Sequence, residues 1–106
     1  MKHLKVKCKE DFIQQVRDGD LELARIVIRT VLQNLNSKPG RFNIAEIEFE
    51  DEGEIYELSC HSDEFILTLE KNLELLIEAE AYEECIKVTS ALRYLKSNNQ
   101  SYDVQI

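Results

Sequence analysis

The sequence predicts an α+β domain with the element order β-α-α-β-β-α-α, in which a small antiparallel sheet packs against two helical hairpins. Three short segments alternate apolar and polar residues, as half-buried strands do. Four longer segments repeat apolar residues at helical spacing. The chain has 106 residues, of which 43% are hydrophobic and 32% charged. This composition indicates a single folded domain, residues 1–106, rather than a disordered chain.

The first strand is predicted near the N-terminus, where apolar residues alternate with basic ones: Leu4, Val6 and Cys8. A short helix follows, with apolar residues at helical spacing. We expect Gly19 to end this helix, because glycine tolerates the left-handed backbone of a C-cap. We expect Asp20 to cap the N-terminus of the next helix.

The second helix, predicted at residues 21–36, is apolar around most of its circumference. Such a width indicates a central helix that packs on several neighbours, or a helix whose second face meets another subunit. A homodimer through this helix is therefore one possible arrangement. Residues 36–40, with Pro39 and Gly40, are expected to end this helix and form a turn.

A β-hairpin is predicted next, around a two-residue turn at Glu52 and Gly53. In that register the core side carries the opposed pairs Phe49–Tyr56, Ile47–Leu58 and Ala45–Cys60. The other side carries the pairs Glu46–Ser59, Glu48–Glu57 and Glu50–Ile55.

Two more helices are predicted in the C-terminal half. Ser62 is expected to cap the third helix, although residues 64–70 also fit a strand; the helix is favoured because the apolar repeat continues through Leu76. A fourth helix follows a break near residues 79–80 and ends near Ser97. Its predicted inward side chains are Tyr82, Cys85, Ile86, Thr89, Leu92 and Leu95. The tail, residues 98–106, is expected to be frayed or an edge strand.

Two short segments resemble known helical motifs. GDLELAR, residues 19–25, resembles the helix start of ankyrin repeats, without their Thr-Pro-Leu-His turn. LELLIEAEAYEECIKVTSALRYL, residues 73–95, resembles the UVR motif, a helical hairpin that makes protein contacts in repair and protease-adaptor proteins. That motif has an Arg-Asp pair where this chain has Thr89 and Ser90. Each resemblance covers under a quarter of the chain, so neither assigns a family.

The net charge of −8 is concentrated in the middle of the chain. Residues 43–84 carry a net charge of −14, whereas residues 1–42 carry +4 and residues 85–106 carry +2. Such a field repels phosphate, so direct binding of nucleic acid is not expected. It favours a basic protein surface as partner, while a solvated acidic surface without a partner is the simpler alternative.

The three cysteines do not indicate a disulfide framework, because their number is odd. Residues 1–9 lack the apolar core of a signal peptide, and no apolar run approaches the length of a membrane span. We therefore expect a cytoplasmic protein with no membrane partner.

No arrangement of residues predicts a metal, a cofactor or a catalytic site. The histidines and cysteines, which are the potential metal ligands, lack the paired spacing of a metal site: His3, Cys8, Cys60, His61 and Cys85. No glycine-rich phosphate loop occurs either. If Cys60 faces the core, the adjacent His61 faces away from it. A small enzyme or ligand binder would have to use this Cys60–His61 pair.

The acidic hairpin is the predicted functional surface. Lys5 and Lys7 would compensate half of its charge if the first strand joins the sheet in phase. Ile55, an apolar residue among the glutamates, is the expected anchor, and protonation of His61 in mildly acidic solution would modulate docking. The predicted partner-binding residues are Glu46, Glu48, Glu50, Ile55, Glu57, His61, Glu70, Glu74 and Glu78.

The sequence therefore predicts a non-catalytic regulatory or inhibitory protein that docks on a basic partner. Small immunity proteins and phage anti-defence proteins share this size and charge. The alternatives are a homo-oligomeric structural module and a DNA mimic. Duplex DNA would carry about eight phosphates over the roughly 14 Å that separate Glu46 from Glu50 along a strand, twice the charge of the hairpin.

Overall fold

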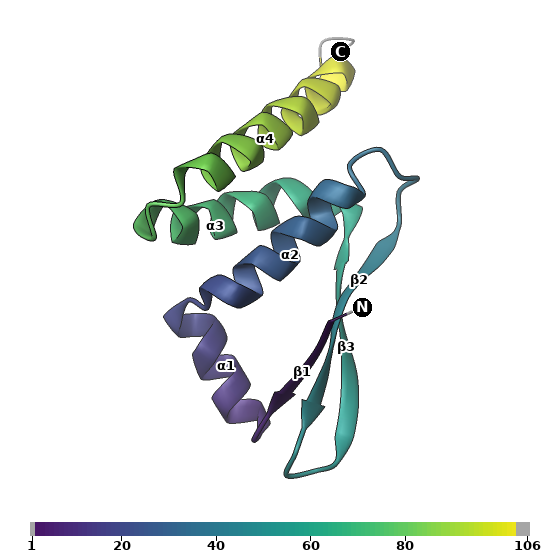
Figure 1. The fold of residues 1–106 in the computed structure, drawn as a ribbon. Coiled ribbons are helices and arrows are strands. Elements are labelled where there is room, and N and C mark those ends of the chain that lie inside the picture. The colour runs from purple at the N-terminus through teal and green to yellow at the C-terminus, as the bar shows by residue number, and fades with distance from the viewer. Residues whose placement is uncertain (1, 104–106) are drawn as a thin grey trace.

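The computed structural model describes residues 2–103 and has the predicted class and element order (Figure 1). The α+β prediction is therefore confirmed, and residues 65–70 are helical rather than a strand. The elements are β1 (Lys2–Val6), α1 (Lys9–Asp18), α2 (Leu21–Gln33), β2 (Arg41–Phe49), β3 (Glu54–His61), the 3-10 turn η1 (Ser62–Glu64), α3 (Phe65–Glu78) and α4 (Tyr82–Asp103).

The sheet has the strand order β1-β2-β3 and is mixed. β2 and β3 form the predicted antiparallel hairpin, but β1 runs parallel to β2, so the expectation of a wholly antiparallel sheet is wrong. Parallel neighbours need a long crossover between them, and α1 and α2 together supply it. Figure 1 shows these two helices leaving one end of β1 and returning the chain to the start of β2.

The hairpin register differs by two residues from the predicted one. Ile47 pairs with Tyr56 and Glu46 pairs with Glu57, because the turn contains the four residues 50–53. The turn is closed by a hydrogen bond of 2.8 Å from the Gly53 amide to the Phe49 carbonyl, with Gly53 at φ +69°. Glu-Gly is a weak signal for a two-residue turn. Because a shift of two residues preserves the faces of both strands, the predicted core side is retained.

A β-bulge in β2 lies between Asn43 and Ala45 and was not predicted. The extra residue, Ile44, is buried, and so is its neighbour Ala45. The bulge thereby changes the phase of alternation. Phe42 and Ile44 face the core before it, and Ala45, Ile47 and Phe49 face the core after it.

The junction between α1 and α2 is the one predicted. Gly19 follows α1 with φ +83°, and the Asp20 carboxylate caps α2 by accepting the Leu23 amide at 2.9 Å. α2 ends at Gln33, three residues earlier than predicted. The Thr30 carbonyl accepts the side-chain amide of Asn34, which satisfies one of the last carbonyls of the helix.

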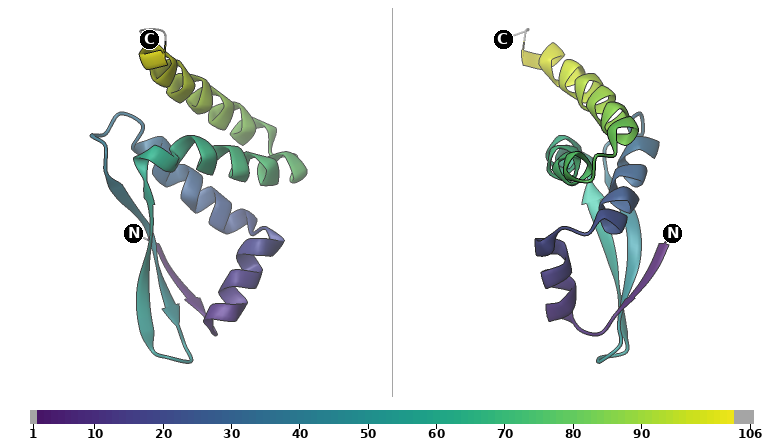
Figure 2. Two further views of the ribbon diagram at one scale, coloured as in Figure 1. Left: turned by 180° about the vertical axis from the view of Figure 1, so that it is seen from behind. Right: turned by 60° about the vertical axis from the view of Figure 1, so that its left-hand side comes forward.

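α2 is the central helix, and other elements of the same molecule cover most of its circumference. Its buried residues are Leu23, Ala24, Ile26, Ile28 and Val31. Its neighbours are β2, α3 and α4 (Figure 2). The width of its apolar surface is therefore explained within the monomer, and a homodimer through α2 stays a prediction.

α3 and α4 form a helical hairpin, in which Glu80 adopts a left-handed conformation (φ 58°) at the predicted break. α4 packs on the side of α3 that is turned away from the sheet (Figures 1 and 2). Its predicted inward face is right in part: Leu92 is buried, and Cys85 and Leu95 are half-buried against the core. Tyr82, Ile86 and Thr89 are exposed instead, and Val88 and Ala91 are buried in their place.

α4 also runs past the predicted end at Ser97, so residues 98–103 are helical rather than frayed or an edge strand. The remaining tail residues, 104–106, lie outside the described part of the chain. Within residues 2–103, none of the helices combines the length and the apolarity that crossing a membrane requires.

The three glycines provide a test of the α1–α2 junction. A Cβ atom on Gly19 would lie 2.6 Å from Cδ2 of Leu75, in addition to the strain of its positive φ. Gly53 has a positive φ but no atom within 4 Å of such a Cβ, and Gly40 has neither problem. We expect urea unfolding to show losses of about 2–3 kcal/mol for Gly19→Ala, about 1 kcal/mol for Gly53→Ala and close to zero for Gly40→Ala. Equal losses for the first two variants would contradict the close approach to Leu75.

Acid unfolding provides a test of the Asp20 cap. The Leu23 amide, with help from the Gln15 side-chain amide, lowers the pKa of the Asp20 carboxyl in the folded protein. The unfolded chain therefore binds a proton more readily, so this stabilisation is present above about pH 4 and is lost as the pH falls through the lowered pKa. Asn also caps helices but does not titrate. We expect the free energy of unfolding of Asp20→Asn to fall less steeply on acidification than that of wild type. An equal dependence on pH in the two proteins would exclude this role of Asp20.

Candidate functional site

The outer face of the sheet, the side turned away from the core, carries four of the nine predicted site residues. The register aligns His3, Glu46 and Glu57 in one row across the three strands. The next row contains Lys5, Glu48 and Ile55. We call Glu46, Glu48, Glu57 and Ile55 the acidic sheet face. All of its members come from the hairpin, and their common orientation follows from the two-residue period of the strands.

Glu46 and Glu57 lie directly opposite one another, which places two like charges at a cross-strand position. The prediction had opposed Glu48 to Glu57 instead, but Glu48 lies opposite Ile55. The repulsive pair thus exists, displaced by the change in register. Like charges at such positions cost a few tenths of a kcal/mol up to about 1 kcal/mol.

His3 bridges two of the glutamates. Its Nδ1 lies 3.3 Å from a carboxylate oxygen of Glu46, and its Nε2 lies 3.1 Å from one of Glu48. Carboxylates only accept hydrogen bonds, so both contacts are hydrogen bonds only when both ring nitrogens carry a proton. The alternation of His3 with Lys5 already places His3 on this side of the first strand, although only the lysines were expected to compensate the glutamates.

The expected compensation by lysines is not present. Lys5 lies beside Glu48 in the register, and Lys7 follows the end of β1. Within residues 2–103, neither lysine forms an ion pair with a glutamate of the acidic sheet face. His3 is the residue that contacts these carboxylates.

Five of the predicted site residues lie elsewhere. Glu50 begins the hairpin turn, where its amide donates to the carbonyl of Val6, and is not on the strand face. Three glutamates are exposed along α3, and the first of them forms an ion pair of 3.1 Å with Lys96 of α4: Glu70, Glu74 and Glu78. The fifth, His61, ends β3 and caps the following turn.

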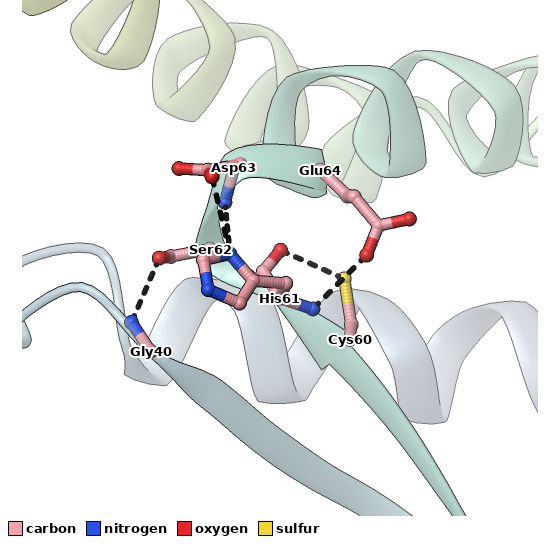
Figure 3. Close-up of polar contacts among 6 residues, drawn as sticks. All are labelled: Gly40, Cys60, His61, Ser62, Asp63 and Glu64. Carbon is pink, nitrogen blue, oxygen red and sulfur yellow. Dashed lines mark hydrogen bonds and ion pairs between the residues drawn. The ribbon is translucent and has the colours of Figure 1, made fainter.

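His61, rather than the predicted Ser62, caps the chain at η1. Its Nδ1 accepts the amide of Asp63 at 3.1 Å, and the Glu64 carboxylate accepts the amide of His61 at 3.2 Å (Figure 3). The Ser62 hydroxyl instead accepts the Gly40 amide at 3.0 Å and ties the two ends of the hairpin together. His61 therefore has a local structural role that depends on an unprotonated Nδ1.

Cys60 and His61 do not converge on a common site. Cys60 is buried, and its sulfur lies 3.4 Å from the His61 carbonyl (Figure 3). The same sulfur lies 3.5 Å from the Thr68 hydroxyl. The imidazole of His61 contacts Asp63 instead. His3 is on the outer face of the sheet, whereas Cys60 faces the core. Among the described residues, no three or more histidine, cysteine, aspartate or glutamate side chains are grouped so that they could hold a metal ion.

Ile55 is the apolar member of the acidic sheet face and is 56% exposed.

An aromatic row at the adjacent hairpin tip connects the hairpin to α1 through edge contacts: Phe12 with Phe49 at 6.2 Å, and Phe49 with Tyr56 at 5.3 Å. Lys9 lies 5.1 Å from the centre of the Tyr56 ring. The contact with Tyr56 and the nearby carboxylate of Glu52 raise the pKa of Lys9, so this cation persists at neutral pH.

Comparisons with models of known protein families, with curated protein sequences and with solved structures found no match to this chain.

The opposed glutamates give a prediction for stability. Glu57→Lys replaces the repulsion of Glu46 by attraction, so we expect the free energy of unfolding to rise by about 0.5 kcal/mol. Glu50→Lys makes the same change of charge outside the strand pairing and should raise it less. Urea unfolding at low salt measures both variants. A loss of stability in Glu57→Lys would show that Glu57 has a favourable contact that this geometry does not contain.

Proposed function

We propose that this chain is a non-catalytic interaction protein that regulates or inhibits a larger macromolecule by docking its acidic sheet face on a basic protein surface. The observation that supports this most directly is the pairing across the outer face of the sheet. Three glutamates there lie beside an exposed isoleucine, and among the described residues His3 is the side chain that contacts carboxylates of this face, those of Glu46 and Glu48. Such a surface combines charge for steering with an apolar centre for contact.

The energetics of the sheet are consistent with a face that is used. The chain keeps Glu46 opposite Glu57, although a neutral residue at either position would relieve the repulsion. A basic partner would convert this cost into favourable charge pairing. Charges at the rim of an interface contribute chiefly to the association rate and to specificity, whereas buried apolar residues contribute more to the lifetime of the complex. We therefore assign steering to the glutamates and anchoring to Ile55.

The distribution of charge favours a protein partner over DNA mimicry. Glu50 is in the turn, so the acidic sheet face has three carboxylates instead of the expected four. On α3, Glu70 is paired with Lys96. Duplex DNA carries about one charge for every 1.7 Å of its axis. Over the length of this surface, the charge density is far below that of a nucleic acid.

The test is capture of partners from cell lysate by the immobilised protein at low and high salt. We expect a partner that binds wild type, is weakened by salt and is lost with Glu46→Lys/Glu48→Lys/Glu57→Lys. The matched control, Glu74→Lys/Glu78→Lys/Glu83→Lys, makes the same change of net charge on α3 and α4 and should keep the partner. In purified complexes, Ile55→Ala should shorten the lifetime about tenfold.

Two results would contradict the proposal. The first is an identical set of partners for wild type and the sheet variant. The second is equal loss with the sheet variant and the helix control, because net charge alone would then account for binding.

A further inference from the structure

A groove on the core side of the sheet has the properties of a binding site for a small molecule. It has a volume of about 380 Å³ and is bounded by α1, α2, α3 and the inner face of β2 and β3. Small-molecule sites commonly begin at about this volume. The groove is on the opposite side of the sheet from the acidic sheet face, so it is independent of the proposed docking function.

The walls of the groove are largely apolar. Phe12 and Val16 of α1 form one side, and the α2 side chains facing them are buried or half-buried. α1 itself has no fully buried residue, and Val16 is 50% exposed. The apolar lining residues are Phe12, Val16, Leu23, Ala24, Val27, Ile44, Leu58 and Leu75.

The polar lining is rich in hydrogen-bond acceptors and contains no lysine, arginine or histidine. Its two carboxylates belong to Asp20, which precedes α2, and Glu64, which precedes α3. Thr68 and Asn72 of α3 add oxygen atoms one helical turn apart. The Asn72 amide donates to the Thr68 carbonyl at 2.8 Å, which leaves the side-chain oxygen and the second N–H of Asn72 for a ligand.

Both carboxylates already serve the fold and retain capacity for a cation. Asp20 caps α2 through the Leu23 amide, which also lowers the pKa of the Asp20 carboxyl and keeps it ionised at neutral pH. One oxygen of Glu64 accepts the amide of His61 (Figure 3). A carboxylate has about four lone-pair sites, so each can accept a further charge-assisted hydrogen bond.

We infer that this groove binds a small organic cation that has an apolar body and one protonated amine. The apolar body would contact the side chains of α1, α2 and the sheet, and the ammonium group would donate to one of the two carboxylates of the lining, Asp20 or Glu64. An organic anion is disfavoured because the lining has two carboxylates and no basic side chain, and a neutral ligand would gain no charge-assisted hydrogen bond from them. The net charge of −8 also raises the concentration of cations near the protein.

The test uses phenylbutylamine as the probe, with phenylbutanol and phenylbutanoate as controls of the same apolar body. Amide chemical shifts of the isotope-labelled protein are followed at up to millimolar ligand. We expect saturable shifts at groove residues with the amine, weaker binding of the alcohol and no binding of the carboxylate.

The variant Asp20→Asn/Glu64→Gln removes the two carboxylate charges of the groove but keeps the oxygens that accept the capping hydrogen bonds. Asn retains the helix cap and Gln retains the reciprocal capping contact, so the variant should remain folded. We expect its affinity for the amine to fall about tenfold, a change of about 1.4 kcal/mol, with little change for the alcohol. The control Asp51→Asn/Glu78→Gln removes two charges outside the groove and should bind the amine as wild type does.

Val16→Trp, which fills the mouth of the groove without changing charge, should weaken the binding of both the amine and the alcohol. The inference is overturned if the amine causes no saturable shifts, or if these map outside the groove. It is also overturned if the alcohol binds as well as the amine, or if the two double variants have equal affinity. None of these results bears on capture of a partner by the acidic sheet face, so the two proposals fail separately.

Discussion

The packing of α2 against β2, α3 and α4 is the interaction on which the rest of the structure depends. Val31 is inaccessible to solvent, and four other residues of α2 are buried beside it. Burial of one large aliphatic side chain stabilises a fold by roughly 1.5–3 kcal/mol, so this helix contributes more than any other single element of comparable length. Its position determines which face of the sheet becomes the core.

The choice of the core face explains how the chain tolerates its acidic residues. An opposed pair of glutamates costs at most about 1 kcal/mol, less than burial of one side chain such as Ile47 contributes. Hydrophobic burial therefore decides the orientation of the hairpin, and the glutamates take the face that remains. Repulsion on this face is small enough to persist without any partner.

The two proposed sites lie on opposite sides of one thin sheet, and each presents carboxylates to a cation. On the outer face the carboxylates come from a regular strand pairing, and they are open to solvent. In the groove they come from two capping residues, Asp20 and Glu64, whose positions are set by helix starts. The same side chains that satisfy backbone amides at these starts thus also define the charge of the groove.

The sequence by itself determined the element order, the α1–α2 junction at Gly19 and Asp20, and the outward direction of Glu46, Glu48 and Glu57. These features depend on local backbone preferences and on the two-residue period of a strand, which a change of register by two does not alter. Only the tertiary structure decided the parallel pairing of β1, the bulge at Ile44 and the contacts of His3. It also decided the inward face of α4 and the groove beside α1, because these depend on where distant elements pack, and neighbouring residues along the chain carry no information about that.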